Sequence, residues 1–143
     1  MKVCFDTSVL VAAVVDQLAN HESALACFAR YTRGRHRGCC ATHALAECYA
    51  TLTALPLPRR VQPEEARMLV EENFLGRLEI LELTRADYAA ALARTSRLGL
   101  VSGMICDALH LAAAERAKCQ RLFTFDVAHF RRLQPLSTSV SAP

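Results

Sequence analysis

Short β-rich segments alternate with longer helical segments along this chain, and this alternation limits the possible folds more than any other feature. Strands are expected at residues 2–5, 38–41, 78–83, 121–125 and 136–140, with helical segments between them. Strands that are separated by helices pair in parallel through crossover connections. The pattern therefore predicts an α/β fold, a three-layer α/β/α sandwich around a mainly parallel sheet.

Capping signals place the helices between these strands. Asn20 and Thr42 precede or open apolar-periodic segments as candidate N-caps, and Pro63 stands at a first-turn position beside two acids. Thr84 and Asp87 have the spacing of a capping box. The residues from 55 to 63, LPLPRRVQP, are expected to form a surface loop.

The length and composition fit one domain, residues 1–143. Hydrophobic residues make up 52% of the chain, which is enough for a sizeable core, and no repeat or linker interrupts it. No segment reaches the roughly 18 or more uncharged apolar residues of a membrane helix. The first 17 residues resemble a signal peptide, but Asp6 interrupts the apolar run. We therefore expect a cytoplasmic protein that does not contact a membrane.

The seven cysteines indicate reduced thiols. Their number is odd, they form no CxxC motif, and most have apolar neighbours. In the segment CCATH, Cys39, Cys40 and His43 are possible zinc ligands, but their spacing is irregular and a fourth ligand is not evident.

Four acidic residues are expected at one edge of the predicted sheet. Asp6 and Asp126 directly follow strands, while Glu47 and Asp107 lie near the starts of helices that face the same edge. Each has a structural alternative: Asp6 and Asp126 as N-caps, Asp107 as a partner of the helix dipole, and Glu47 as part of a solvated stripe. Ligands of parallel sheets bind at this carboxyl edge, so the convergence of all four acids indicates a functional site.

Four neighbouring carboxylates raise one another's pKa unless a cation compensates them. Carboxylate oxygens without a His/Cys cage suit Mg²⁺ or Mn²⁺, and such an ion can support hydrolysis of a phosphodiester. The net charge is +3, with 17 basic and 14 acidic residues. The densest basic segment contains Arg33, Arg35 and Arg37, which are candidate RNA contacts or, alternatively, a solvated helix C-terminus.

The segments VCFDTSVLVAA, ATHALAECYA, ICDALHLAAA and LFTFDVAHF together resemble the PIN domain family, and their order covers nearly the whole chain. A domain of this size is most similar to the VapC toxins of toxin–antitoxin pairs. Position 106, often aromatic in that family, is Cys here.

The resemblance implies an Mg²⁺- or Mn²⁺-dependent endoribonuclease that leaves 5′-phosphate and 3′-hydroxyl ends. It also implies a homodimer that is inhibited by a small antitoxin. Asp6, Glu47, Asp107 and Asp126 match the family's acidic quartet, with Asp6, Asp107 and Asp126 as metal ligands. Thr7, Ser8 and Thr124 match polar residues of the pocket.

Two alternatives remain open at this point. An aspartyl-phosphate phosphatase would use Asp6 as its nucleophile, but such enzymes commonly carry a second Asp where this chain has Ser8. A PIN-like module that binds RNA or a partner without cutting is the other, although degenerate modules usually lose acids and this chain keeps all four. A phosphoenzyme trap tests the first alternative, and metal-dependent RNA cleavage tests the second.

Overall fold

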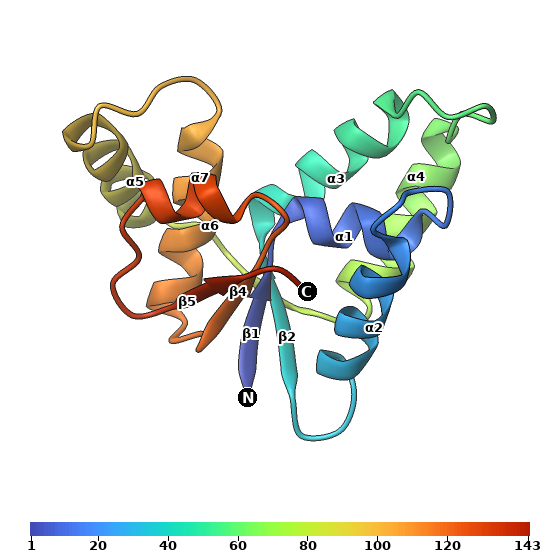
Figure 1. Ribbon diagram of the computed structural model, residues 1–143, viewed down its shortest axis with the longest axis horizontal. Coiled ribbons are helices and arrows are strands. Elements are labelled where there is room, and N and C mark those ends of the chain that lie inside the picture. The colour runs from blue at the N-terminus through green and yellow to red at the C-terminus, as the bar shows by residue number, and fades with distance from the viewer.

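A computed structural model describes all residues 1–143 and contains a five-stranded parallel sheet (Figure 1). The strand order is β3-β2-β1-β4-β5, so β1 is central. All four strand pairs are parallel. The strands are β1 (Lys2–Phe5), β2 (Arg37–Ala41), β3 (Glu79–Leu81), β4 (Arg121–Phe123) and β5 (Ser139–Ser141).

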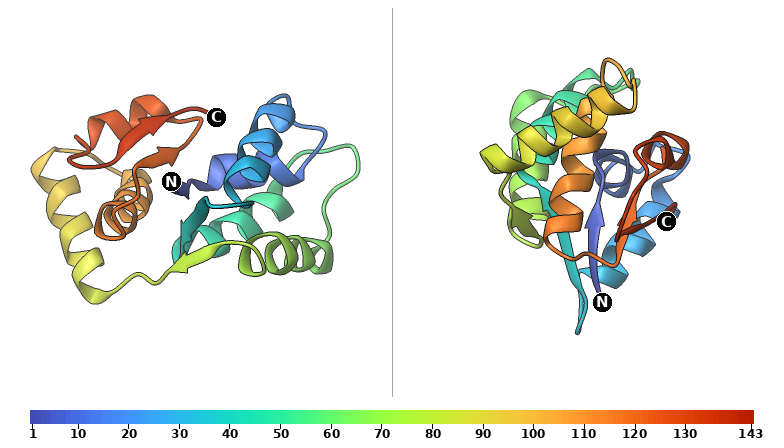
Figure 2. Two further views of the ribbon diagram at one scale, coloured as in Figure 1. Left: turned by 90° about the horizontal axis from the view of Figure 1, so that it is seen from below. Right: turned by 90° about the vertical axis from the view of Figure 1, so that its left-hand side faces the viewer.

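The helices form a layer on each side of this sheet, as the views in Figure 2 show. The helical elements are α1 (Thr7–Val14), α2 (His21–Tyr31), α3 (Thr42–Ala54), α4 (Pro63–Val70), a π-helical turn (Glu71–Leu75), α5 (Arg85–Arg97), α6 (Met104–Arg116) and α7 (Val127–Arg132). Helices α1 to α4 pack on one core cluster, and α5 to α7 on the other. The expected three-layer α/β fold is confirmed.

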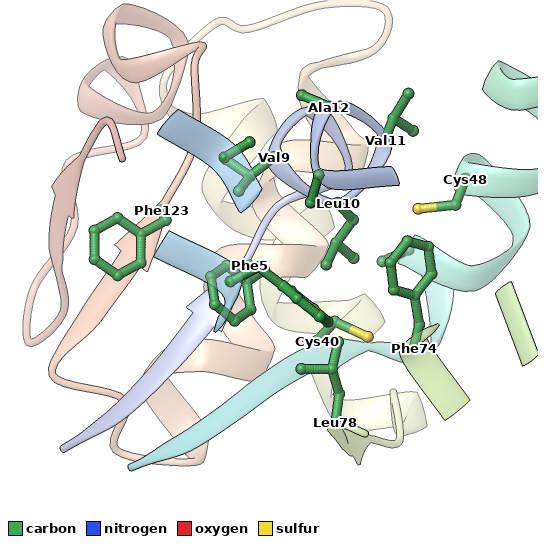
Figure 3. Close-up of a cluster of buried hydrophobic side chains, with 14 of the residues drawn as sticks. Phe5, Val9, Leu10, Val11, Ala12, Cys40, Cys48, Phe74, Leu78 and Phe123 are labelled. Atoms are coloured by element: carbon green, nitrogen blue, oxygen red, sulfur yellow. The ribbon is translucent and has the colours of Figure 1, made fainter. Parts of the chain in front are cut away.

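Alternating residues of the central strands supply the two cores. Val3 and Phe5 belong to the cluster under α1 to α4, whereas Cys4 between them belongs to the cluster under α5 to α7. This alternation is what a strand buried on both faces requires. Figure 3 shows the first cluster, in which Phe5 packs near Phe123.

The capping predictions are borne out in part. Thr84 and Asp87 form the expected capping box at the start of α5. Thr42 is the first residue of α3, and Ala41 occupies the N-cap position; the Thr42 hydroxyl instead accepts a hydrogen bond from the backbone N–H of Leu83 at 3.2 Å. Asn20 precedes α2, but its side chain makes no capping hydrogen bond. All seven cysteines are free thiols.

The sheet topology creates one point where strand order reverses. The chain moves from β1 to β2 and β3 on one side, and then returns to β4 and β5 on the other side of β1. The carboxyl ends of β1 and β4 therefore flank the position where parallel α/β sheets usually bind ligands. None of the helices has the length and apolar character needed to cross a membrane.

Candidate active site

Asp6 lies at the carboxyl end of β1 and is held in place by three donors. Its Oδ2 atom accepts hydrogen bonds from the Ser8 hydroxyl at 2.8 Å, the Thr124 hydroxyl at 2.9 Å and the Ser8 backbone N–H at 3.4 Å. Asp6 is thus the N-cap of α1 and a fixed member of the site at once. Because all these bonds go to Oδ2, the second oxygen, Oδ1, is left to face other groups.

Asp126 reaches the same edge from the adjacent strand β4. The strand ends at Phe123, two residues earlier than expected, because the next residues turn toward Asp6. The Thr124 hydroxyl accepts from the Asp126 N–H at 2.9 Å, and the Phe125 N–H donates to the Ser8 hydroxyl at 3.1 Å. Asp126 occupies the N-cap position of α7, as the structural alternative expected, but its carboxylate makes no capping hydrogen bond.

Glu47 comes from the second turn of α3 and is tied to a buried histidine. Its Oε1 atom lies 2.5 Å from Nε2 of His110 and accepts a hydrogen bond from the Thr7 hydroxyl at 3.2 Å. Burial raises the pKa of Glu47, but the hydrogen bond to His110 and the nearby histidine charges outweigh burial and hold the pKa below its usual value. Glu47 is therefore a poor proton acceptor at neutral pH.

Asp107 lies in the first turn of α6 between these groups. Burial raises its pKa to about 6, and the negative charges of Asp6 and Asp126 act in the same direction. The hydrogen bonds that hold Asp6 and Glu47 do not reach Asp107. The charges of His110 and His129 lower the pKa of Asp107, but they do not offset burial and the neighbouring acids, so its carboxylate is destabilised.

The four acids line one hollow of about 360 Å³, together with Thr7 and Ser8. Asp6, Glu47, Asp107 and Asp126 come from four separate segments of the chain. Thr124 is fully buried beneath them and binds Asp6. The structure therefore brings together the whole predicted acidic quartet and the three predicted polar residues.

A larger groove of about 580 Å³ lies between α5 and α6, but both of its acidic residues are already paired with arginines. Arg94 pairs with Glu115 at 2.9 Å, and Arg116 pairs with Asp87 at 3.0 Å. Arg97 and alanines make up the rest of the lining. Because both carboxylates of this groove are paired with arginines, the acidic hollow is the better candidate for chemistry.

Arg33, Arg35 and Arg37 do not lie near the acidic hollow. Arg37 begins β2 and is in register with Lys2 at the start of β1, so this basic segment lies at the amino edge of the sheet. Figure 1 shows the α2–β2 connection at the opposite end of the strands from α1 and α3. The exposed basic residues His129, Arg131 and Arg132 lie instead on α7, the helix that begins directly after Asp126 at the carboxyl edge.

His110 is a residue of the site that the sequence-based quartet did not include. Its side chain is 1% exposed, with Nε2 at 2.5 Å from Glu47 and 3.8 Å from Oδ1 of Asp6. Burial lowers the pKa of His110, but the bond to Glu47 and the surrounding carboxylates outweigh burial, so the pKa is raised. Asp107 and His110 are three residues apart, which puts both on one side of α6. This spacing was the sequence feature from which a role of His110 in the site could have been predicted.

Comparisons with known proteins agree with this geometry. The family model of the PIN domain matches residues 3–134. Ribonuclease VapC27 of Mycobacterium tuberculosis is 36% identical over 111 residues, which are 77% of this chain and 75% of that protein.

Solved structures share the fold at lower identity. VapC20 of Mycobacterium tuberculosis, described as a sarcin-ricin loop cleaving toxin, superposes with a TM-score of 0.72 at 18% identity, covering 89% of this chain and 92% of that one. VapBC2 of Rickettsia felis, bound to a DNA fragment from its promoter, gives 0.69 at 18% identity, covering 100% and 99%. With its acidic quartet at the carboxyl edge of a parallel sheet and a family match over residues 3–134, this chain belongs to the PIN domain family.

Proposed function

We propose that this protein is a metal-dependent endoribonuclease and the toxin of a toxin–antitoxin pair. One observation carries the proposal: four carboxylates from separate segments meet in one hollow, in a chain that is 36% identical to a VapC ribonuclease. A PIN-like module that only binds RNA would have no need to hold four repelling charges together.

The donor set fits a hard divalent cation. Oδ1 of Asp6 accepts no hydrogen bond, Asp126 makes no capping bond, and Asp107 has a raised pKa of about 6 because of burial and neighbouring charge. Oxygen ligands of this kind suit Mg²⁺ or Mn²⁺. Asp6, Asp107 and Asp126 would hold the ion, which would supply charge stabilisation at the scissile phosphate.

The chain's own residues prepare this site for hydrolysis. Thr124 and Ser8 fix Asp6 and the turn that carries Asp126, so two carboxylates are positioned before substrate arrives. Glu47, kept ionised by His110, orients the attacking water by accepting its hydrogen bond. His129 and the two arginines of α7, the helix that begins after Asp126, are candidate contacts for the RNA backbone.

Ser8 weakens the phosphatase alternative, because the position where such enzymes carry an acid is a hydroxyl bonded to Asp6. The basic segment at residues 33–37 would contact RNA only at a distance from the cleavage site. The partner we propose is a small antitoxin that presents an arginine to the acids in place of the metal's charge. Similar structures of VapBC assemblies support such a partner.

Cleavage of an RNA mixture with Mg²⁺ and with EDTA tests the enzyme proposal. We expect Mg²⁺-dependent products with wild type, and none with Asp126→Asn, whose exposed carboxylate makes no bond needed for folding. Asp16→Asn, an exposed acid outside the hollow, is the matched control and should cleave normally. RNA binding without cleavage by wild type would instead support the non-catalytic module.

A further inference from the structure

Two facing helices each present a pair of metal-binding side chains beside the acidic hollow. Helix α3 carries His43 and Glu47, and helix α6 carries Cys106 and His110. Both pairs have a spacing of four residues, which places each pair on one face of its helix. The imidazole rings of His43 and His110 are 5.8 Å apart, so these two faces meet.

Three of these side chains bring their ligand atoms close together. One atom each from His43, Glu47 and Cys106 lies within 4.8 Å of the other two. Nε2 of His43 is already 3.6 Å from Oε1 of Glu47. Ligands of a tetrahedral zinc ion are about 3.3–3.8 Å apart, given metal–ligand bonds of about 2.0–2.3 Å. A side-chain adjustment of about 1 Å at Cys106 is therefore enough to complete the geometry.

The Nε2 atom of His43 is a buried polar atom without a hydrogen-bond partner. A polar atom in this condition is costly, and a bond to a metal ion is one way to satisfy it. His110, through its bond to Glu47, would hold the ligating carboxylate in orientation as outer-shell partners of metal sites do.

The donor types select a different ion from the one that suits the acidic hollow. A thiolate, an imidazole nitrogen and a carboxylate oxygen together suit Zn²⁺, whereas Mg²⁺ and Mn²⁺ prefer oxygen ligands alone. Three protein ligands and an open fourth position are a known arrangement for Zn²⁺. Cys39 and Cys40, which the sequence places near His43, are fully buried in β2, so Cys106 from a distant segment is the relevant thiol.

We propose that His43, Glu47 and Cys106 form a second metal site, selective for Zn²⁺ or a similarly thiophilic divalent ion, and that its occupation inhibits the enzyme. Binding replaces the S–H bond of Cys106 with a metal–sulfur bond, and the proton passes to solvent. Glu47 is shared by this site and the acidic hollow, so zinc withdraws it from the attacking water. The inhibitory effect rests on the proposed ribonuclease function, whereas the binding site does not.

Cobalt titration of the reduced protein tests the site without any enzymatic readout. Co²⁺ should produce a thiolate-to-cobalt charge-transfer band in the near ultraviolet and the visible bands of a tetrahedral ion, and Zn²⁺ should abolish both. Cys106→Ser should lose the charge-transfer band. His43→Ala removes a proposed ligand and should lower the affinity for zinc at least roughly 10–100-fold. That is the loss typical of removing only an outer-shell partner of a metal site.

Two controls separate this site from other ligands. Cys27→Ser removes a thiol that is buried in the core cluster under α1 to α4, and this variant should keep the cobalt band. Asp126→Asn removes an acid of the hollow and should also keep it. Circular dichroism checks that each variant is folded, and His43→Gln replaces His43→Ala if that variant is not. A missing charge-transfer band in wild type, or a retained band in Cys106→Ser, would overturn the proposed site.

The inhibitory effect is measured as the ratio of Mg²⁺-dependent RNA cleavage with and without Zn²⁺. We expect this ratio to fall in wild type at zinc concentrations that leave it unchanged in Cys106→Ser. Equal inhibition of both proteins would overturn the coupling between the two sites. A cobalt band in a protein that cleaves no RNA would support the metal site and count against the ribonuclease function instead.

Discussion

Replacing Asp107 with Asn should stabilise the protein in the absence of metal. Its pKa rises from 3.8 to about 6 through burial and the charges of Asp6 and Asp126. A difference of about 2 pKa units corresponds to about 3 kcal/mol. Because the carboxylate is only partly buried and solvent screens it, we discount this to about 1–2 kcal/mol.

The pH dependence identifies the source of this gain. The folded state holds the Asp107 proton up to about pH 6, whereas the unfolded chain releases it near 3.8. Between these values the folded state binds more protons, so wild-type stability falls as pH rises. The advantage of Asp107→Asn should therefore be absent below about pH 4, grow through this interval and stay constant above about pH 6.

Thermal melts of the two proteins in EDTA, at a series of pH values, measure the effect. At pH 7.5 the variant should melt higher by about 2–8 °C, at about 2–4 °C per kcal/mol for a domain of this size. Excess Mg²⁺ should raise the melting temperature of wild type and have less effect on the variant, since a ligand stabilises only the state that binds it. Asp16→Asn, outside the hollow, should show neither effect.

The opposite result is expected if Asp107 only complements the dipole of α6. The variant would then lose about 0.3–1 kcal/mol of stability and keep its cleavage activity. An Asp107→Asn protein that melts below wild type in EDTA at pH 7.5 and still cleaves RNA would refute the assignment of Asp107 to a metal site.

Three further outcomes follow from the structure. Thr124→Val removes the buried hydroxyl that joins Asp6 to Asp126. The free energy of unfolding, measured in urea, should fall by about 1–3 kcal/mol, and RNA cleavage should fall as well. Unchanged stability would contradict this prediction. The exposed apolar side chains Tyr49 and Met68 on α3 and α4 predict a homodimer, so light scattering should give twice the chain mass and Met68→Lys should lower it. Expression of wild type should arrest bacterial growth, whereas comparable accumulation of Asp126→Asn should not, as growth curves with immunoblots will show.

Local sequence patterns were enough to predict the layers of the fold and the acids at strand ends. Strand and helix periodicities depend on near neighbours, and Asp6 and Asp126 follow strands directly, so parallel pairing places them at one edge. The capping box of Thr84 and Asp87 was predictable for the same reason, since both partners lie within one turn.

The location of the basic segment required the sheet register. Arg37 is the first residue of β2, and its pairing with Lys2 at the start of β1 assigns residues 33–37 to the amino edge. A charge count along the chain carries no information about which edge a segment occupies. Candidate RNA contacts near the hollow are therefore on α7.

The pairings within the site were decided by tertiary structure alone. Glu47 and His110 are 63 residues apart, yet Nε2 of His110 lies 2.5 Å from the Glu47 carboxylate. Their meeting depends on α3 and α6 packing across the switch point, which follows from the order β2-β1-β4. Cys106 reaches His43 for the same reason. Strand order is set by the packing of two whole cores, and short-range patterns do not encode it, so the sequence by itself determined the parts of the site but not their contacts.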